Sequence, residues 1–299
     1  MNVPAKLAAF TLVLGVVFGG TYTAGALAGP VASGTADQTA GHDPVPHTAG
    51  AAGHQPAEGH GTNEAPAEPG GLAVSADGYT LRQLTAAPTV GQPGEFAFQI
   101  LDTAGKPVTG FQTSHDKQLH LIVARRDLTG FQHLHPTMAP DGTWRTPLTL
   151  PAAGQWRVFA DFLPAGRDRQ VTLGLDVPVA GDYQPQPLPA PTSTAIVDDY
   201  TVTAHGDLAA GQTSRLTLTV AKAGVPVTDL QPYLGAYGHL VALRAGDLAY
   251  LHVHPQQTDT AGPGIVFDAE IPAAGPYRLF LDFQHAGVVR TAAFTATAA

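Results

Sequence analysis

The chain has 299 residues, no cysteine and a formal net charge of −9. This length predicts about two domains. The acidic balance, with no cluster of lysine and arginine, argues against binding to nucleic acid. The absence of cysteine excludes disulfides, thiolate metal sites, iron–sulfur clusters and a cysteine nucleophile. The 34 glycines and 26 prolines, with only 13% charged residues, favour short strands and turns over helices.

The N-terminal segment 1–28 predicts export. Residues 7–28 carry no charge, and about 20 such residues are enough to span a bilayer. The segment ends in Ala26-Leu27-Ala28, a small-x-small pattern that signal peptidase cuts. A cleaved signal peptide and an uncleaved membrane anchor both remain open. In either case the rest of the chain lies outside the cytoplasm, secreted or anchored to the cell membrane by this helix.

Residues 29–71 form a tract rich in histidine, proline and glycine, with almost no large apolar side chains. Such a segment cannot bury enough surface to offset its ordering entropy, so we expect a disordered linker. Loose capture of metal by its histidines is one interpretation, and a plain polar spacer is the other. The four histidines are His42, His47, His54 and His60.

From residue 72 onward the chain repeats itself with an offset of about 120 positions. Residues 105–112 match 224–231, and residues 151–162 match 272–283. Short alternating runs such as 96–100 and 216–220 are typical of strands bounded by turns. About seven such strands per unit predict an immunoglobulin-like β-sandwich, with a small β-barrel as the near alternative. The predicted organisation is repeat 1 at 72–179, a proline-rich linker at 180–195 and repeat 2 at 196–299.

A spaced histidine motif recurs in both repeats. Residues 120–136 match 239–255 in the position of three histidines and a final proline. The histidines are His120, His133 and His135 in repeat 1, and His239, His252 and His254 in repeat 2. Histidine is the commonest metal ligand among side chains.

The spacing predicts that each triad shares one face of a hairpin. With Gly246-Asp247 as a two-residue loop, His239 lies opposite His254, and His252 lies on the diagonal. Cross-strand neighbours and residues two apart on a strand point to the same face. The same face carries apolar residues, so we expect it to point into the sandwich, with the histidines at the end of the core. Those apolar residues are Ile122, Ala124 and Phe131, or Val241, Leu243 and Tyr250.

Two aspartates recur at matched places in a later strand. Asp161 and Asp282 each occupy the third position of a Phe-x-Asp-Phe pattern or its counterpart. We interpret each as a fourth ligand of its own repeat's triad or as a partner that fixes a histidine tautomer. An ordinary strand-end acid is the other interpretation. His115 and His285 have no counterpart in the other repeat and are expected at the surface, and nothing is expected of His205.

Ligands of this kind suit copper(II), with zinc and nickel behind it. The predicted function is therefore a metal-binding protein for sequestration or delivery. The alternative is an envelope interaction module without metal, in which the histidines are structural and the partner is another envelope protein. No serine elbow, phosphate-binding loop or dinucleotide fingerprint is present, so no enzyme activity and no catalytic residue are expected.

Residues 233–243 and 251–255 resemble the most recognisable stretch of exported actinobacterial proteins labelled heavy-metal-binding or secreted. The two units also look like YtkA-like domains, and more loosely like copper carriers of the CopC kind. This resemblance covers roughly three quarters of the chain. It implies a β-sandwich outside the cytoplasm with a role in metal handling. The methionine-rich signature of copper(I) carriers is missing, because only Met138 lies outside the initiator, and this favours copper(II).

Overall fold

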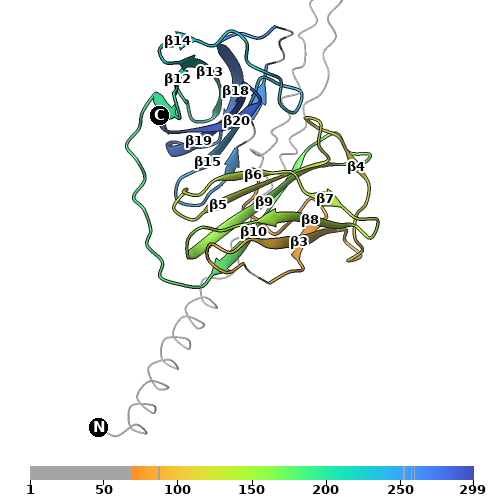
Figure 1. The fold of residues 1–299 in the computed structure, drawn as a ribbon. Helices are drawn as coiled ribbons and strands as arrows, with labels where there is room; N and C mark the ends of the chain where they lie inside the picture. Colours follow the sequence, from red (N-terminus) through yellow and green to blue (C-terminus); the bar gives the residue numbers. More distant parts are fainter. Residues whose placement is uncertain (1–68, 87, 252, 257, 259) are drawn as a thin grey trace, which may run out of the picture. The chain divides into compact units, whose positions relative to one another are not determined.

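The computed structural model describes residues 69–86, 88–251, 253–256, 258 and 260–299 (Figure 1). The predicted signal or anchor segment and nearly all of the predicted linker, with its four histidines, lie outside these residues. In the described ranges, no helix is long and apolar enough to cross a membrane. Every regular element there is a β-strand.

The first repeat forms two antiparallel sheets. One sheet has the order β1-β2-β3-β8-β7, and the other has the order β10-β9-β5-β6, with β4 paired to β9. The strands are β1 (Ser75–Ala76), β2 (Tyr79–Gln83), β3 (Gly94–Leu101), β4 (Phe111–Gln112), β5 (Leu119–Arg125), β6 (Gln132–Leu134), β7 (Thr137–Met138), β8 (Thr143–Leu148), β9 (Gly154–Pro164) and β10 (Val171–Val179).

The second repeat has the same plan. One sheet has the order β11-β12-β13-β18-β17, with β14 paired to β13, and the other has the order β16-β15-β19-β20. The strands are β11 (Thr194–Val197), β12 (Tyr200–His205), β13 (Gln212–Lys222), β14 (Val225–Pro226), β15 (Gly238–Arg244), β16 (Tyr250–Leu251), β17 (Val253–Pro255), β18 (Gly264–Ile271), β19 (Gly275–His285) and β20 (Val288–Ala298). The predicted pair of tandem immunoglobulin-like β-sandwiches is thus confirmed, and the alternative of a small closed barrel is not.

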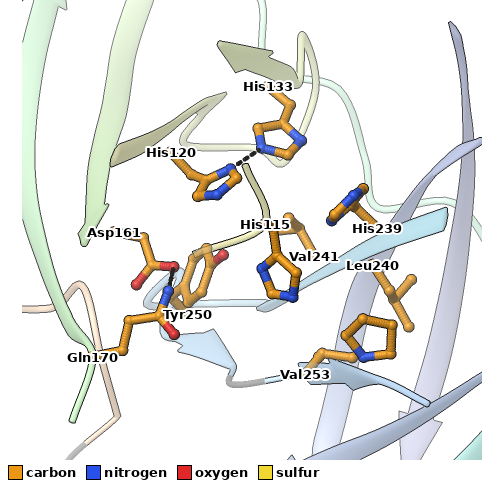
Figure 2. A pocket seen from close by; sticks show the side chains of 11 residues that line it. His115, His120, His133, Asp161, Gln170, His239, Leu240, Val241, Tyr250 and Val253 are labelled. Atoms are coloured by element: carbon orange, nitrogen blue, oxygen red, sulfur yellow. Dashed lines mark hydrogen bonds between the residues drawn. The ribbon is translucent and has the colours of Figure 1, made fainter. Parts of the chain in front are cut away.

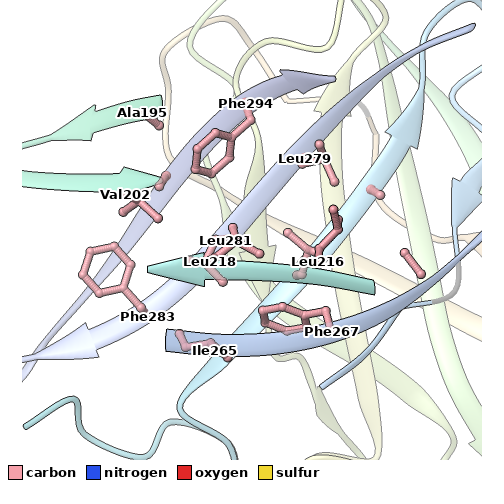
Figure 3. Close-up of a cluster of buried hydrophobic side chains, with 14 of the residues drawn as sticks. Ala195, Val202, Leu216, Leu218, Ile265, Phe267, Leu279, Leu281, Phe283 and Phe294 are labelled. Carbon is pink, nitrogen blue, oxygen red and sulfur yellow. The ribbon is translucent and has the colours of Figure 1, made fainter. Parts of the chain in front are cut away.

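Each sandwich has its own apolar core, made by alternate residues of the facing sheets. In repeat 1 the core includes Leu119, Leu121 and Val123 from β5. In repeat 2 it includes Leu279, Leu281 and Phe283 from β19, packed against β13 and β18 (Figure 3). These odd-numbered positions point inward, so the even-numbered residues of β5 and β19 lie on the outer face of each sandwich.

Those outer faces are not exposed to water, because they form a third buried cluster that joins the two repeats. Its residues are Ile122, Ala124, Leu128 and Phe159 from repeat 1, and Val241, Leu243, Leu248 and Phe280 from repeat 2. The expectation that this face points into its own sandwich is therefore wrong. A strand such as β5, in which all seven residues are buried, has one face in the sandwich core and the other against the neighbouring repeat.

The predicted hairpin of repeat 2 is correct in register and wrong in extent. Leu243 pairs with Tyr250, as the predicted register requires, but the backbone N–H of Leu248 donates to the carbonyl of Arg244, which closes a longer loop. Beyond Leu251 the chain changes sheets, and His254 pairs with Asp268 of β18. The predicted pairing of His239 with His254 is thus not formed.

Candidate metal centre

The three histidines of repeat 1 come together on the outer face of the β5–β6 hairpin. Ile122 of β5 pairs with His133 of β6, so His120, two residues earlier on β5, shares that face with His133. Nδ1 of His120 and Nε2 of His133 are 3.0 Å apart. His135 follows directly after β6, and one ring nitrogen from each of the three residues lies within 4.8 Å of the others.

The tautomer of His120 is set by a turn just before β5. Its Nε2 lies 3.1 Å from the backbone oxygen of Ser114. A carbonyl oxygen only accepts hydrogen bonds, so Nε2 carries the proton and Nδ1 is left with a lone pair. Repeat 2 has the same arrangement, because Nε2 of His239 lies 2.7 Å from the backbone oxygen of Tyr233. In each repeat the first histidine therefore presents an unprotonated Nδ1.

The tautomer of His133 is set by an aspartate of the other repeat. Its Nδ1 lies 2.7 Å from Oδ2 of Asp282, and the two side chains are 6% and 5% exposed. A carboxylate accepts the proton of Nδ1, which leaves the lone pair of His133 on Nε2. Asp282 was expected to serve the triad of repeat 2, and the structure places its carboxylate against repeat 1 instead.

Three ring nitrogens are consequently left for one shared occupant. Nδ1 of His120 and Nε2 of His133 face each other at 3.0 Å, although both are lone-pair acceptors when the rings are neutral. Nε2 of His135 is buried and has no hydrogen-bond partner among the described residues. Two facing lone pairs and an unsatisfied buried atom are both costly. A proton shared by His120 and His133 would remove the first cost, and a metal ion bound by all three rings would remove both.

Burial makes protonation of three rings in and beside the cluster unfavourable. The pKa of His120 is lowered to about 3, first by desolvation and then by the charge of His133. The pKa of His135 is also lowered to about 3, by desolvation and by His133 and His120. The pKa of His239 falls to about 4, mainly by desolvation. These rings are neutral at physiological pH, which is the form that binds metal ions.

A small cavity of about 50 Å³ adjoins the cluster (Figure 2). His115, His120, His133, Asp161 and His239 contribute to its lining. The ring of His115 packs edge-on against His239, with centroids 5.2 Å apart, and also against His120, at 6.0 Å. His115 was predicted to be a surface residue. The sequence gives no signal for its position, because it sits in a turn with φ 48° and has no counterpart in repeat 2.

Asp161 is buried beside the cluster without contacting its nitrogens. It pairs with His120 across β9 and β5, but its carboxylate accepts hydrogen bonds from Thr172, at 2.7 Å, and from Gln170, at 2.9 Å. Burial raises its pKa to about 6. The structure therefore does not place this carboxylate as a tautomer-fixing partner of His133, the role that Asp282 has.

The second triad is only partly described. His239 is buried on β15, the backbone of His254 is in β17, and His252 lies outside the described residues. Its convergence stays a prediction. His285, expected at the surface, is instead largely covered, with its ring nitrogens near Tyr200 and Asp229. His205 is exposed and lies 3.4 Å from the hydroxyl of Thr219.

The geometry of the repeat 1 cluster fits a transition-metal ion. Imidazole nitrogens bound about 2.0–2.1 Å from a tetrahedral ion lie about 3.3 Å apart. The 3.0 Å separation between His120 and His133 is already close to that distance. The other nitrogen lies within 4.8 Å, so a shift of about 1.5 Å closes the set. A carboxylate that holds the second nitrogen of a ligating histidine is the usual outer partner in such sites.

The sequence matches the family model described as Domain of unknown function (DUF8832) twice, at residues 74–179 and 195–299. The chain belongs to this family. The two matches show the tandem repeat that the internal comparison predicts. The resemblance to exported heavy-metal-binding proteins stays a prediction. No curated protein matches the chain.

Some solved structures are similar to this chain at low identity. Invasin, a bacterial integrin-binding protein, is 16% identical with a TM-score of 0.22, covering 74% of this chain and 39% of that chain. This chain therefore spans well under half of the invasin chain. Domains 4 and 5 of the S-layer protein SbsC are 11% identical with a TM-score of 0.23. The match covers 76% of this chain and 98% of that chain. Tandem immunoglobulin domains of titin are 12% identical with a TM-score of 0.20. The match covers 74% of this chain and 96% of that chain.

Proposed function

We propose that this protein is an exported metal-binding protein, and that His120, His133 and His135 bind one divalent ion. The observation that carries the proposal is the set of three buried ring nitrogens. Two of them face each other at 3.0 Å with the opposite nitrogens already committed to Ser114 and Asp282, and the third has no partner in the described part of the chain. The role is binding for sequestration or delivery, not catalysis.

We propose copper(II) as the ion that this site binds, ahead of zinc and nickel. All three accept imidazole, and the affinity order of divalent ions at a nitrogen site places copper(II) highest. The three imidazoles leave a coordination position open. The ring of His239 from repeat 2 lies close to the cluster, 6.3 Å from His133 and 6.5 Å from His120 by centroid. We place the protein outside the cytoplasm, secreted or anchored, on the basis of residues 1–28.

A second ion in repeat 2 is part of the proposal. His239 already has the tautomer of its counterpart, because Tyr233 accepts from its Nε2. His252 and His254 complete the set by the repeated spacing.

The alternative function is an envelope interaction module in which the histidines are structural. The hydrogen bonds from His120 to Ser114 and from His239 to Tyr233 favour it, because a structural histidine makes such bonds to neighbouring loops. His135 separates the two functions. As a structural residue it contributes a buried nitrogen without a partner, which destabilises the fold, whereas as a ligand it has a use.

The test is copper(II) binding by calorimetry to the full-length protein and to a His135→Ala variant. Both carry alanine at His42, His47, His54 and His60, which removes loose binding by the N-terminal tract. We expect one tight site to weaken by more than about 100-fold in the variant, since losing a ligand exceeds the 10–100-fold cost of losing an outer partner. The melting temperature of the metal-free protein should stay the same or rise.

A His205→Ala variant is the matched control, because His205 is exposed and far from the cluster in the sheet order. It should leave both copper affinity and melting temperature unchanged. If the parent shows no tight site, and chelator does not change its melting temperature, the interaction module is the better account.

A further inference from the structure

We infer that the metal site of repeat 1 is completed across the repeat interface by Asp282, a positioning residue supplied by repeat 2. This inference rests on the proposed function. Asp282 binds no metal in this arrangement. It holds Nδ1 of His133 and thereby points Nε2 of the same ring at His120.

The two aspartates occupy equivalent places in their own sheets and differ in the partner of one carboxylate oxygen. Asp161 pairs with His120, and Asp282 pairs with His239. Each accepts a hydrogen bond from a threonine on the next strand, Thr172 at 2.7 Å or Thr291 at 2.5 Å. The second carboxylate oxygen of Asp161 accepts from Gln170 of its own repeat. The second oxygen of Asp282 accepts from His133 of the other repeat.

An aromatic stack fixes this contact. The rings of Phe131 and Phe280 are parallel within 6°, with centroids 4.1 Å apart. Phe131 precedes His133 by two residues, and Phe280 precedes Asp282 by two on β19. Residues two apart on a strand share a face, so the stack lies directly beside the histidine–aspartate contact. The same interface therefore docks the two sandwiches and orients the ring of His133.

Asp282 also supplies the charge that the site lacks. The three histidines are neutral ligands, so a divalent ion would bring two positive charges into a buried region. The carboxylate of Asp282 is 5% exposed and touches a ligand ring, and it is placed to offset that charge. Because a coupling between binding and docking is reciprocal, bound metal should hold the two repeats together as strongly as docking promotes binding.

The experiment compares Asp282→Asn with Asp161→Asn in the full chain. Both variants carry alanine at the four tract histidines and at His252 and His254, which leaves the repeat 1 triad intact and, of the repeat 2 triad, only His239. Copper(II) affinity is measured by competition with a chelator. We expect Asp282→Asn to lose about 10–100-fold, as for the loss of an outer partner of a ligating histidine. Asp161→Asn should stay within about threefold of the parent, on the same scale.

Electron paramagnetic resonance of bound copper(II) separates positioning from general stability. Loss of the negative charge beside Nδ1 of His133 should change the nitrogen hyperfine pattern in Asp282→Asn and leave it unchanged in Asp161→Asn. Equal affinities and equal spectra for the two variants would overturn the inference. Absence of copper binding in the parent itself would instead overturn the proposed function, so the two failures are distinguishable.

If Asp282→Asn does not fold, hydrogen–deuterium exchange tests the inference on the parent, which carries alanine at the four tract histidines and at His252 and His254 but keeps Asp282. The three ligands of the tested site lie in repeat 1, yet binding should slow amide exchange in β19 and β15 of repeat 2, which face the site across the interface. Slower exchange in repeat 1 alone would overturn the inference.

Discussion

Replacing Phe280 by alanine should lower the free energy of unfolding by about 3–5 kcal/mol, the range for removing a buried phenylalanine. Phe280 is 3% exposed and stacks on Phe131 of the other repeat. Its loss opens a cavity between the sandwiches and not inside one of them. We therefore expect the variant to unfold in two steps, because the shared cluster is what makes two domains unfold together.

Leu281→Ala is the matched control, since Leu281 is the next residue on β19 and points the opposite way, into the core of repeat 2. It should cost about 2–5 kcal/mol while leaving the repeat 1 metal affinity unchanged. Phe280→Ala should reduce that affinity as well. Calorimetric unfolding and copper titration of both variants give the comparison. If Phe280→Ala lowered the free energy of unfolding by less than about 1 kcal/mol, a docked interface would be contradicted, because removing a buried aromatic ring costs about 3–5 kcal/mol.

The sequence predicts the sandwiches better than it predicts their contact. Alternation and turn residues are local signals, so strands and the tandem repeat can be found in the chain itself. β5 carries apolar residues on both faces, and that pattern indicates burial on both sides. It does not say that the second side is covered by another copy of the same unit. The prediction placed the face that carries the histidines inside its own sandwich. In the structure that face packs against the other repeat, and the opposite face of β5 lines the sandwich core.

The same limit applies to the site. The spacing of His120, His133 and His135 places them on one hairpin, and a register argument is enough to bring them together. Asp282 and His115 depend on contacts between segments far apart in the chain. The repeat even misleads at Asp282, because equivalence within each unit suggests that each aspartate serves its own histidines. Only packing of the outer faces puts Asp282 against His133 while its equivalent, Asp161, remains bonded within its own repeat.

Metal-free protein should lose at least about 2 kcal/mol of stability between pH 7.5 and pH 5.5. A buried histidine whose folded pKa lies below its unfolded value resists protonation that the unfolded chain accepts, so stability falls as pH drops below about 6.5. His120 and His239, with folded pKa values of about 3 and about 4, each cost about 1.4 kcal/mol at pH 5.5. His135, with a folded pKa of about 3 and a less completely buried ring, adds to this loss.

Asp161 acts in the opposite direction and reduces the net loss. Its folded pKa of about 6 exceeds the ordinary value of 3.8, so the folded state takes up a proton first and gains about 0.8 kcal/mol as pH falls over the same interval. Asp127, with a pKa lowered to about 2, acts only below pH 4. The titratable groups that face the two histidines include His115, His133, His135 and Asp282, and the two histidines also face each other.

Urea unfolding at the two pH values, with chelator present, measures the loss. A His239→Gln variant keeps a donor for the carbonyl of Tyr233 but does not titrate, so it should lose about 1.4 kcal/mol of the pH-dependent change. An unchanged pH dependence in that variant would show that His239 is not buried as a neutral ring. Saturating metal should also flatten the profile of the parent, because a ligand held by the ion resists protonation until the ion itself is displaced.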